Sequence, residues 1–161
     1  MKAQAVKMVT KVNLMSVVLL VGLLGATQAQ SLQYRIKANI PFDFSIGEKT
    51  LSAGKYSIGR ARPDSDDTIL SVNDPEGKLR AIRTSSSVQV LSPKEKSSLV
   101  FHRYGDQYFL FQVFPAGGNT GRQFVLSQAE RELQRNLAAN SSSGKVAENS
   151  VETVTIIGVL E

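Results

Sequence analysis

Four side chains that could transfer protons or bind a ligand lie close together in the sequence. They are His102, Tyr104, Asp106 and Tyr108, and His102 is the only histidine among 161 residues. Histidine is the commonest general acid or base near neutral pH and a frequent metal ligand. These four residues therefore form the candidate surface or pocket cluster of the chain.

The sequence does not supply the partners that such chemistry needs. A zinc site usually takes three or four His, Cys or carboxylate ligands, and the chain contains no cysteine. The stretch Gly54-Lys-Tyr-Ser-Ile-Gly59 is one residue too long for a serine nucleophile elbow. A calcium loop of the EF-hand type that starts at Asp64 would place Ile69 where glycine is required. We therefore predict no enzyme activity, no metal and no cofactor.

The alternative interpretation is that these residues have only a structural role. A general base needs a substrate proton or a nucleophile within reach, and the sequence indicates neither. We expect His102 to pack against Phe109 with its ring nitrogens hydrogen-bonded, and Glu130 to serve as a helix cap.

The cluster belongs to a stretch, Leu99 to Phe114, that has the pattern of a β-hairpin. Two runs rich in aromatic and β-branched residues flank Gly105-Asp106, and glycine at the first central position suits a type II′ turn. Pairing Tyr104 with Gln107 then sorts the side chains onto two faces. One face would carry Leu99, Phe101, Arg103, Tyr108, Leu110, Gln112 and Phe114, and the other Val100, His102, Tyr104, Phe109, Phe111 and Val113. Neither face is polar enough to be fully exposed to solvent, so we expect other parts of the protein to cover both faces.

Further strands are predicted on both sides of this hairpin. Apolar residues occupy every even position from Tyr34 to Ile46, which indicates a strand with one buried face that breaks near Pro41. After a turn that uses Gly54, a strand through Ile58 to about Arg60 is expected, then strands at 68–72 and 79–84 and a short one at 88–91. The Gly-rich segment 115–121 predicts a loop.

A helix should follow the last loop. Ser127 and Glu130 match a capping box, in which the serine bonds the backbone three residues on and the glutamate reaches back. Ala129, Leu133 and Leu137 would form its apolar stripe, ahead of a polar linker at 139–149 and a last strand at 151–160. The fold class is therefore mainly β, as a single antiparallel β-sandwich or small barrel of about seven to nine strands with one C-terminal amphipathic helix followed by a last strand.

The N-terminus has the three-part pattern of a secretory signal peptide. Lysines precede an apolar run from Leu14 to Leu24, and small residues lead to a cleavage site after Ala29. The apolar run is shorter than the ~20 residues that a spanning helix needs. We therefore predict signal peptide 1–29, one β-rich domain at 30–161, export to the periplasm or the medium, and no transmembrane segment after cleavage.

Cleavage would change the charge of the protein. The signal contains three lysines and no acid, so the remaining chain has 16 basic and 14 acidic residues and a net charge of +2, against +5 for the whole chain. Nucleic-acid binding is therefore not expected.

Four segments together resemble a family of short exported proteins of soil bacteria. The segments are Ile40-Pro-Phe-Asp-Phe44, Leu51-Ser-Ala-Gly-Lys-Tyr56, Phe101-His-Arg-Tyr-Gly-Asp-Gln-Tyr-Phe-Leu110 and Ser127-Gln-Ala-Glu-Arg-Glu-Leu133. The resemblance covers about residues 38–137 and departs at Ser52 and Val125, where proline is usual. It implies export and a shared fold, and it carries no activity and no site residue.

Two functions are compatible with these patterns. The first is a non-enzymatic envelope or secreted β-domain that engages a protein or a cell-envelope component through an exposed strand edge or the helix. The second is a small β-barrel that carries an apolar ligand, by analogy of fold only. The first is preferred because no feature of the sequence demands a cavity.

Overall fold

In a computed structural model, residues 35–62, 68–142 and 151–161 are described, and side chains in the helix are described as far as residue 139. The signal segment 1–29, Tyr34 and the acidic loop 64–67 lie outside these residues. The strands and the helix of the described part occupy these ranges: β1 (Arg35–Ile40), β2 (Phe44–Ile46), β3 (Lys49–Leu51), β4 (Gly54–Arg60), β5 (Ile69–Asn73), β6 (Leu79–Gln89), β7 (Ser97–Tyr104), β8 (Gln107–Phe114), β9 (Thr120–Phe124), α2 (Gln128–Ser142) and β10 (Glu152–Leu160).

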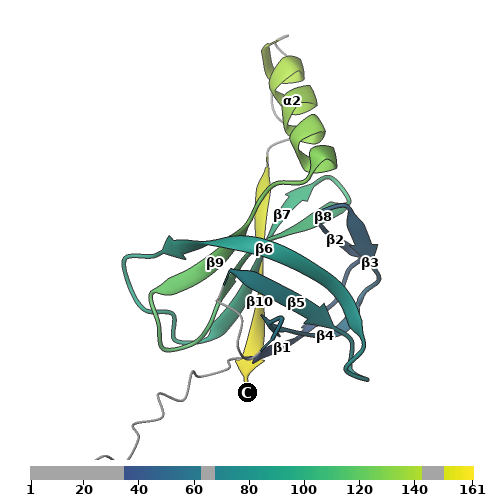
Figure 1. Ribbon diagram of the computed structural model, residues 1–161. Helices are drawn as coiled ribbons and strands as arrows, with labels where there is room; N and C mark the ends of the chain where they lie inside the picture. Colours follow the sequence, from purple (N-terminus) through teal and green to yellow (C-terminus); the bar gives the residue numbers. More distant parts are fainter. Residues whose placement is uncertain (1–34, 63–67, 143–150) are drawn as a thin grey trace, which may run out of the picture. The chain divides into compact units, whose positions relative to one another are not determined.

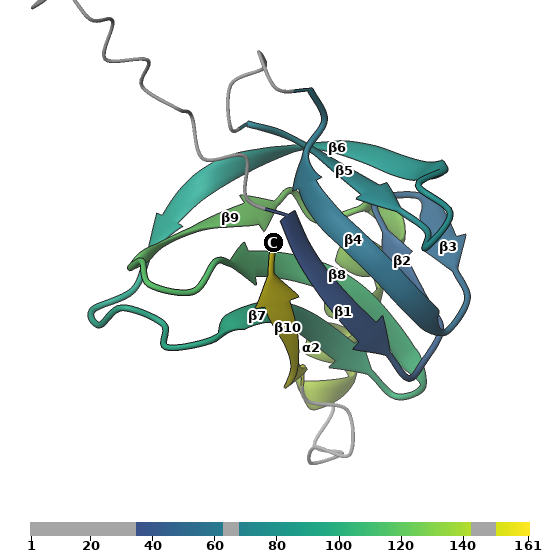
Figure 2. The ribbon, with the colours of Figure 1, turned by 90° about the horizontal axis from the view of Figure 1, so that it is seen from below.

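Eight strands close into a barrel. Their order around the wall is β8-β7-β10-β1-β4-β5-β6-β9, and β9 pairs back onto β8 (Figures 1 and 2). All pairings around this ring are antiparallel. The prediction of a mainly β fold with a helix and then a last strand is confirmed. Of the two predicted architectures, sandwich and barrel, the structure is a barrel.

The short hairpin of β2 and β3 completes one part of the wall. β8 uses the same edge twice, pairing with β2 at Phe109 and with β9 at Gln112 and Val113. The Arg83 Nε on β6 donates to the Ile46 carbonyl oxygen of β2 at 3.4 Å. The β2–β3 hairpin therefore continues from the edge of β8 beyond the part that pairs with β9, and a side chain of β6 bonds it.

Two glycines allow backbones to approach at the joints of the barrel. A Cβ at Gly158 of β10 would lie 2.9 Å from the Lys37 carbonyl oxygen of β1, and a Cβ at Gly121 of β9 would overlap the Phe114 ring of β8. A side chain at either position would push neighbouring strands apart. These glycines therefore belong to strands, although the segment around Gly121 has the composition of a loop.

The barrel interior is filled by apolar side chains. The predicted alternation along β1 and β2 is confirmed, because the even-numbered residues of these strands are buried. The largest fully buried side chains of the core are Ile36, Ile40, Phe44, Ile46, Ile58, Leu70, Val72, Leu99, Phe101 and Val113.

Two element boundaries differ from those predicted. β6 continues through Ser85-Ser-Ser87 to Gln89, where a surface connection and a separate strand at 88–91 were expected. The serines remain extended because β9, which the sequence did not predict, pairs with them. α2 continues to Ser142, past the expected start of the linker at 139, and 143–150 lie outside the described residues.

Candidate functional site

The β7–β8 hairpin positions the candidate cluster. Its predicted register is confirmed from Tyr104↔Gln107 to Phe101↔Leu110. Gly105 adopts a positive φ of 60°, the conformation that favours glycine in such a turn.

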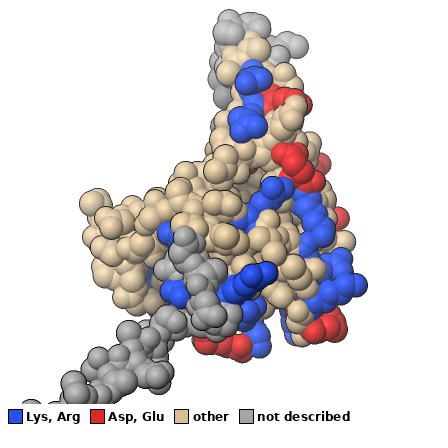
Figure 3. Space-filling view, viewed as in Figure 1, with Lys and Arg blue, Asp and Glu red and all other residues tan. Residues whose placement is uncertain are grey.

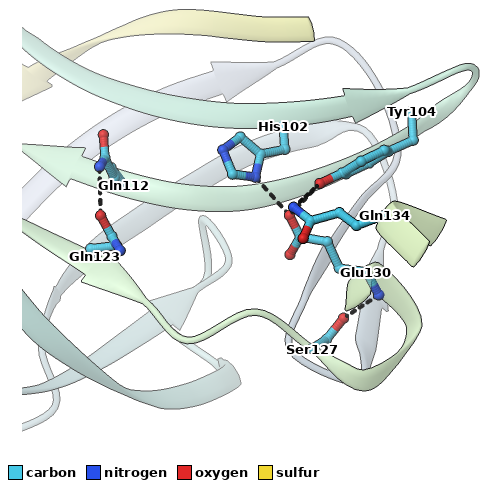
Figure 4. Close-up of polar contacts among 7 residues, drawn as sticks. All are labelled: His102, Tyr104, Gln112, Gln123, Ser127, Glu130 and Gln134. Carbon is cyan, nitrogen blue, oxygen red and sulfur yellow. Dashed lines mark hydrogen bonds and ion pairs between the residues drawn. The ribbon is translucent and has the colours of Figure 1, made fainter. Parts of the chain in front are cut away.

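A bulge between Val100 and Phe101 corrects the predicted faces. The predicted register would pair Leu99 with Gln112. Beyond the bulge Leu99 pairs instead with Val113, so that Val113 enters the core with Leu99. Gln112 is displaced to the outer face, where its amide nitrogen donates to the Gln123 side-chain oxygen at 2.8 Å (Figure 4). The bulge places one extra residue in β8.

The four residues of the predicted cluster do not come together. His102 and Tyr104 share the outer face of the barrel wall, whereas Tyr108 packs against the core and stacks on Phe42 with ring centroids 3.8 Å apart. Asp106 is exposed in the hairpin turn. Only His102 and Tyr104 therefore contribute to one site.

Glu130 of α2 completes that site, although its place in the sequence predicts a helix cap. Its carboxylate Oε1 lies 2.7 Å from His102 Nδ1 and accepts a hydrogen bond from the Tyr104 hydroxyl at 3.2 Å (Figure 4). Glu130 is only 3% exposed. We call His102, Tyr104, Glu130 and Gln134 the Glu130 network.

Half of the predicted capping box is present. The Ser127 hydroxyl accepts from the Glu130 backbone N–H at 3.0 Å, as expected for the first residue of a box. The Glu130 carboxylate, however, turns toward the barrel and bonds His102 and Tyr104. The expectation that Glu130 reaches back to cap the helix is therefore wrong.

The helix face that meets the barrel is shifted from the predicted one. Ala129 is exposed, whereas Glu130 is buried and Leu133, Gln134 and Leu137 are half-buried. Residues at 130, 133, 134 and 137 share one face of a helix. That spacing, together with the single histidine of the chain, was the available signal for Glu130.

Tyr104 holds the centre of the network. Its hydroxyl accepts from the Gln134 amide nitrogen at 2.8 Å and donates to Glu130. The pKa of Tyr104 is raised to about 12, chiefly by burial and also by the nearby Glu130 carboxylate, although the Gln134 hydrogen bond opposes the change. At neutral pH this tyrosine is a hydrogen-bond donor and not a base.

His102 is held on a second side by an aromatic ring. It stacks on Phe111 with ring centroids 3.8 Å apart, and its side chain is 14% exposed. His102 lies directly opposite Phe109 in the strand register, as expected, and Phe111 provides the second ring beside the imidazole. Phe109 also meets Tyr104 edge to face at 5.7 Å.

The network has part of a catalytic arrangement and lacks the rest. A carboxylate orients the imidazole, as in hydrolase triads. In the described part of the chain no serine, threonine or cysteine side chain bonds His102. What the arrangement does physically is to join α2 to the outer face of β7.

A metal site and a membrane-spanning helix are both absent from the part of the chain that the structure describes. No group of three or more His, Cys, Asp or Glu side chains is placed to hold a metal ion. No helix among these residues is long and apolar enough to cross a bilayer.

A large hollow lies on the outer wall of the barrel. It has a volume of about 690 Å³ and is bounded by outward residues of β1, β4 and β5, by the β5–β6 turn and by the C-terminal Glu161. The outward position follows from the register, because Lys37 pairs with Ser57 while Ile36 and Ala38 face the core. We call this hollow the outer groove.

The fold defines a small antiparallel β-barrel with a helix joined to its outside by the Glu130 network. No protein-family model matches the chain, and no curated protein or solved structure matches it either.

Proposed function

We propose that the protein is an exported, non-enzymatic β-barrel domain that binds a protein or another cell-envelope component through its outer surface. Export rests on the signal-peptide pattern of residues 1–29. One observation carries the surface-binding role: the centre of the barrel is occupied by side chains. Phe44, Phe101 and Leu99 are at most 1% exposed there.

The packed interior supports this role over that of a carrier. A barrel that carries an apolar molecule encloses a cavity of at least ~300 Å³ lined by apolar side chains. Here Phe101 meets Phe42 and Phe44 edge to face at 5.2 and 5.5 Å across the position that such a ligand would occupy. The hollow of about 690 Å³ lies outside the wall.

The outer surface also offers apolar contact area. Ile157 and Val159, on the outward side of β10, are 56% and 68% exposed. They flank the joint between β10 and β1, where Lys37 and Glu161 form an exposed ion pair of 2.7 Å. Apolar residues rimmed by charged groups are typical of surfaces that bind a partner.

Expression in an exporting bacterium followed by native mass spectrometry tests the proposal. We expect the purified protein to begin at Gln30 and to have the mass of the polypeptide alone. A fraction that retains residues 1–29 in the membrane would contradict export. An apolar molecule bound at one per chain would contradict the surface role and favour the carrier.

A further inference from the structure

The floor of the outer groove contains two polar atoms that have no partner among the residues that the structure describes. Ser57 Oγ on β4 and Asn73 Oδ1 on β5 are buried and make no hydrogen bond to these residues. The two residues pair directly across the strands, and both border the groove. Ser57 is only 8% exposed. Buried polar atoms are nearly always bonded, so this pair indicates a missing partner.

The groups at the two positions restrict what the partner can be. The Asn73 amide nitrogen already donates to the Gly77 carbonyl oxygen at 3.0 Å, which leaves its oxygen in need of a donor. The Ser57 hydroxyl can donate or accept. A ligand hydroxyl meets both needs, because it can accept from Ser57 and donate to Asn73.

The walls of the groove carry spare positive charge. Arg35, Lys37 and Lys55 line it, and Lys37 is paired with Glu161. Asp74, the other acid at the groove, lies 3.8 Å from Arg80. Among the described residues Arg35 and Lys55 form no ion pair. Figure 3 shows lysine and arginine side chains gathered on the side of the barrel where β3, β4 and β5 lie in Figure 1.

We propose that the outer groove binds a small hydroxylated carboxylate of the uronic acid type. A ring hydroxyl would reach Ser57 and Asn73, and the carboxylate would lie against Lys55 and Arg35. The groove is large enough for one or two sugar rings, since small-molecule sites span about 300–1,000 Å³. This inference rests on the proposed surface-binding function and names the chemistry of one binding partner.

Access to the groove floor requires a side chain to move. Both orphan oxygens are covered in this structure. The Lys37 side chain is 57% exposed, and an exposed ion pair such as the one it forms contributes little stability. Lys37 lies directly opposite Ser57, and its side chain can therefore turn away from Glu161 to admit a ligand to the groove floor.

Nuclear magnetic resonance titration of the purified protein tests the proposal. The probes are D-glucuronate, D-glucose, which lacks the carboxylate, and sulfate, which lacks the hydroxyl. We expect glucuronate to shift the Asn73 side-chain amide and the backbone signals of Ser57 and Lys55, with an affinity at least about tenfold above that for glucose or sulfate. Equal shifts with sulfate would overturn the proposal in favour of a simple anion site, and an absence of shifts at the groove would overturn it outright.

Two serine variants separate binding from folding. Ser57→Ala removes an unpaired oxygen, so we expect an unchanged or raised melting temperature and about fivefold to tenfold weaker glucuronate binding. Ser85→Ala is the matched control, because the Ser85 hydroxyl donates to the Thr68 carbonyl oxygen at 2.9 Å away from the groove. It should lower the melting temperature and leave the affinity unchanged. Loss of stability in Ser57→Ala with unchanged affinity would overturn the assignment.

The outcomes remain distinguishable from failure of the surface-binding function itself. If the protein were a carrier, glucuronate would leave the groove signals unmoved and an apolar adduct would perturb interior residues such as Leu99 and Phe101. If only the ligand class is wrong, the groove stays silent while no apolar adduct is found.

Discussion

The two faces of the β7–β8 hairpin are held by different physical means. On the inner face, Phe101 is fully buried and touches Phe42 and Phe44, which come from a distant part of the sequence. On the outer face, His102 and Tyr104 bond a single carboxylate of α2. Within one strand, Phe101 thus supports the whole barrel, whereas its neighbour His102 supports a single helix.

This difference determines which part of the protein a substitution on each face should destabilise. Apolar burial is shared by every strand around the interior, so a cavity there weakens the cooperative unit. The Glu130 network is directional and local, and it ties down an element whose Leu133 and Leu137 are only half-buried. Its loss should free the helix and leave the barrel closed.

The largest expected effect is that of Phe101→Ala. Deleting this ring leaves a cavity among fully buried side chains, which should lower the free energy of unfolding by about 3–5 kcal/mol. Urea denaturation followed by circular dichroism measures it.

Phe111→Ala is the matched control, because it removes the same ring from the outer face of the adjacent strand. Phe111 is half-buried and stacks on His102, so its loss should cost about 1–2 kcal/mol. Equal costs in the measurement would mean that the two faces are energetically alike.

The hairpin itself was predictable because local chemistry fixes it. Gly105 determines the turn, and the turn determines the pairing of the residues beside it. The bulge could not be predicted, since Leu110 to Val113 continue in a pattern that suits an unbroken strand. A bulge depends on how the barrel must bend, which is a property of all strands together.

β9 and the role of Glu130 were hidden for a related reason. Gly121 lies in a Gly-rich segment that predicts a loop, and it is part of a strand because it pairs with Val88 of β6. Glu130 matches a helix cap locally and is diverted by His102, 28 residues earlier in the chain. In both cases a contact with a residue far away in the sequence overrides the local preference.

The second-largest expected effect is a loss of folding stability at high pH. The pKa of Tyr104 is raised to about 12 in the folded protein, chiefly by burial, against about 10 in the unfolded chain. The unfolded chain therefore loses this proton first, and the stability that depends on a neutral Tyr104 is complete below pH 10 and is lost as the pH rises toward 12. We expect a loss of about 2–3 kcal/mol over that range, measured by urea denaturation at successive pH values.

Tyr104→Phe should remove most of this pH dependence. The variant has no phenol at the network, so its stability should fall less steeply between pH 10 and 12 than that of the unmodified protein. Some dependence should remain, because burial also raises the pKa of Tyr56. A slope unchanged by the substitution would show that Tyr104 does not retain its proton in the folded state.

The smallest effect, and the one that isolates the helix, is that of Glu130→Gln. The substitution keeps the size of the side chain and removes the charge that His102 and Tyr104 bond, so we expect a loss of about 1–2 kcal/mol. Glu132→Gln is the control, because Glu132 is exposed and bonds only Gln128 of the same helix in the described structure, which predicts a change within about 0.5 kcal/mol.

Hydrogen exchange should show faster exchange of α2 amides in Glu130→Gln, with the amides of β7 and β8 still protected. If the strand amides lost protection to the same extent, the helix and the barrel would be a single cooperative unit, and the division between the two faces of the hairpin would be wrong.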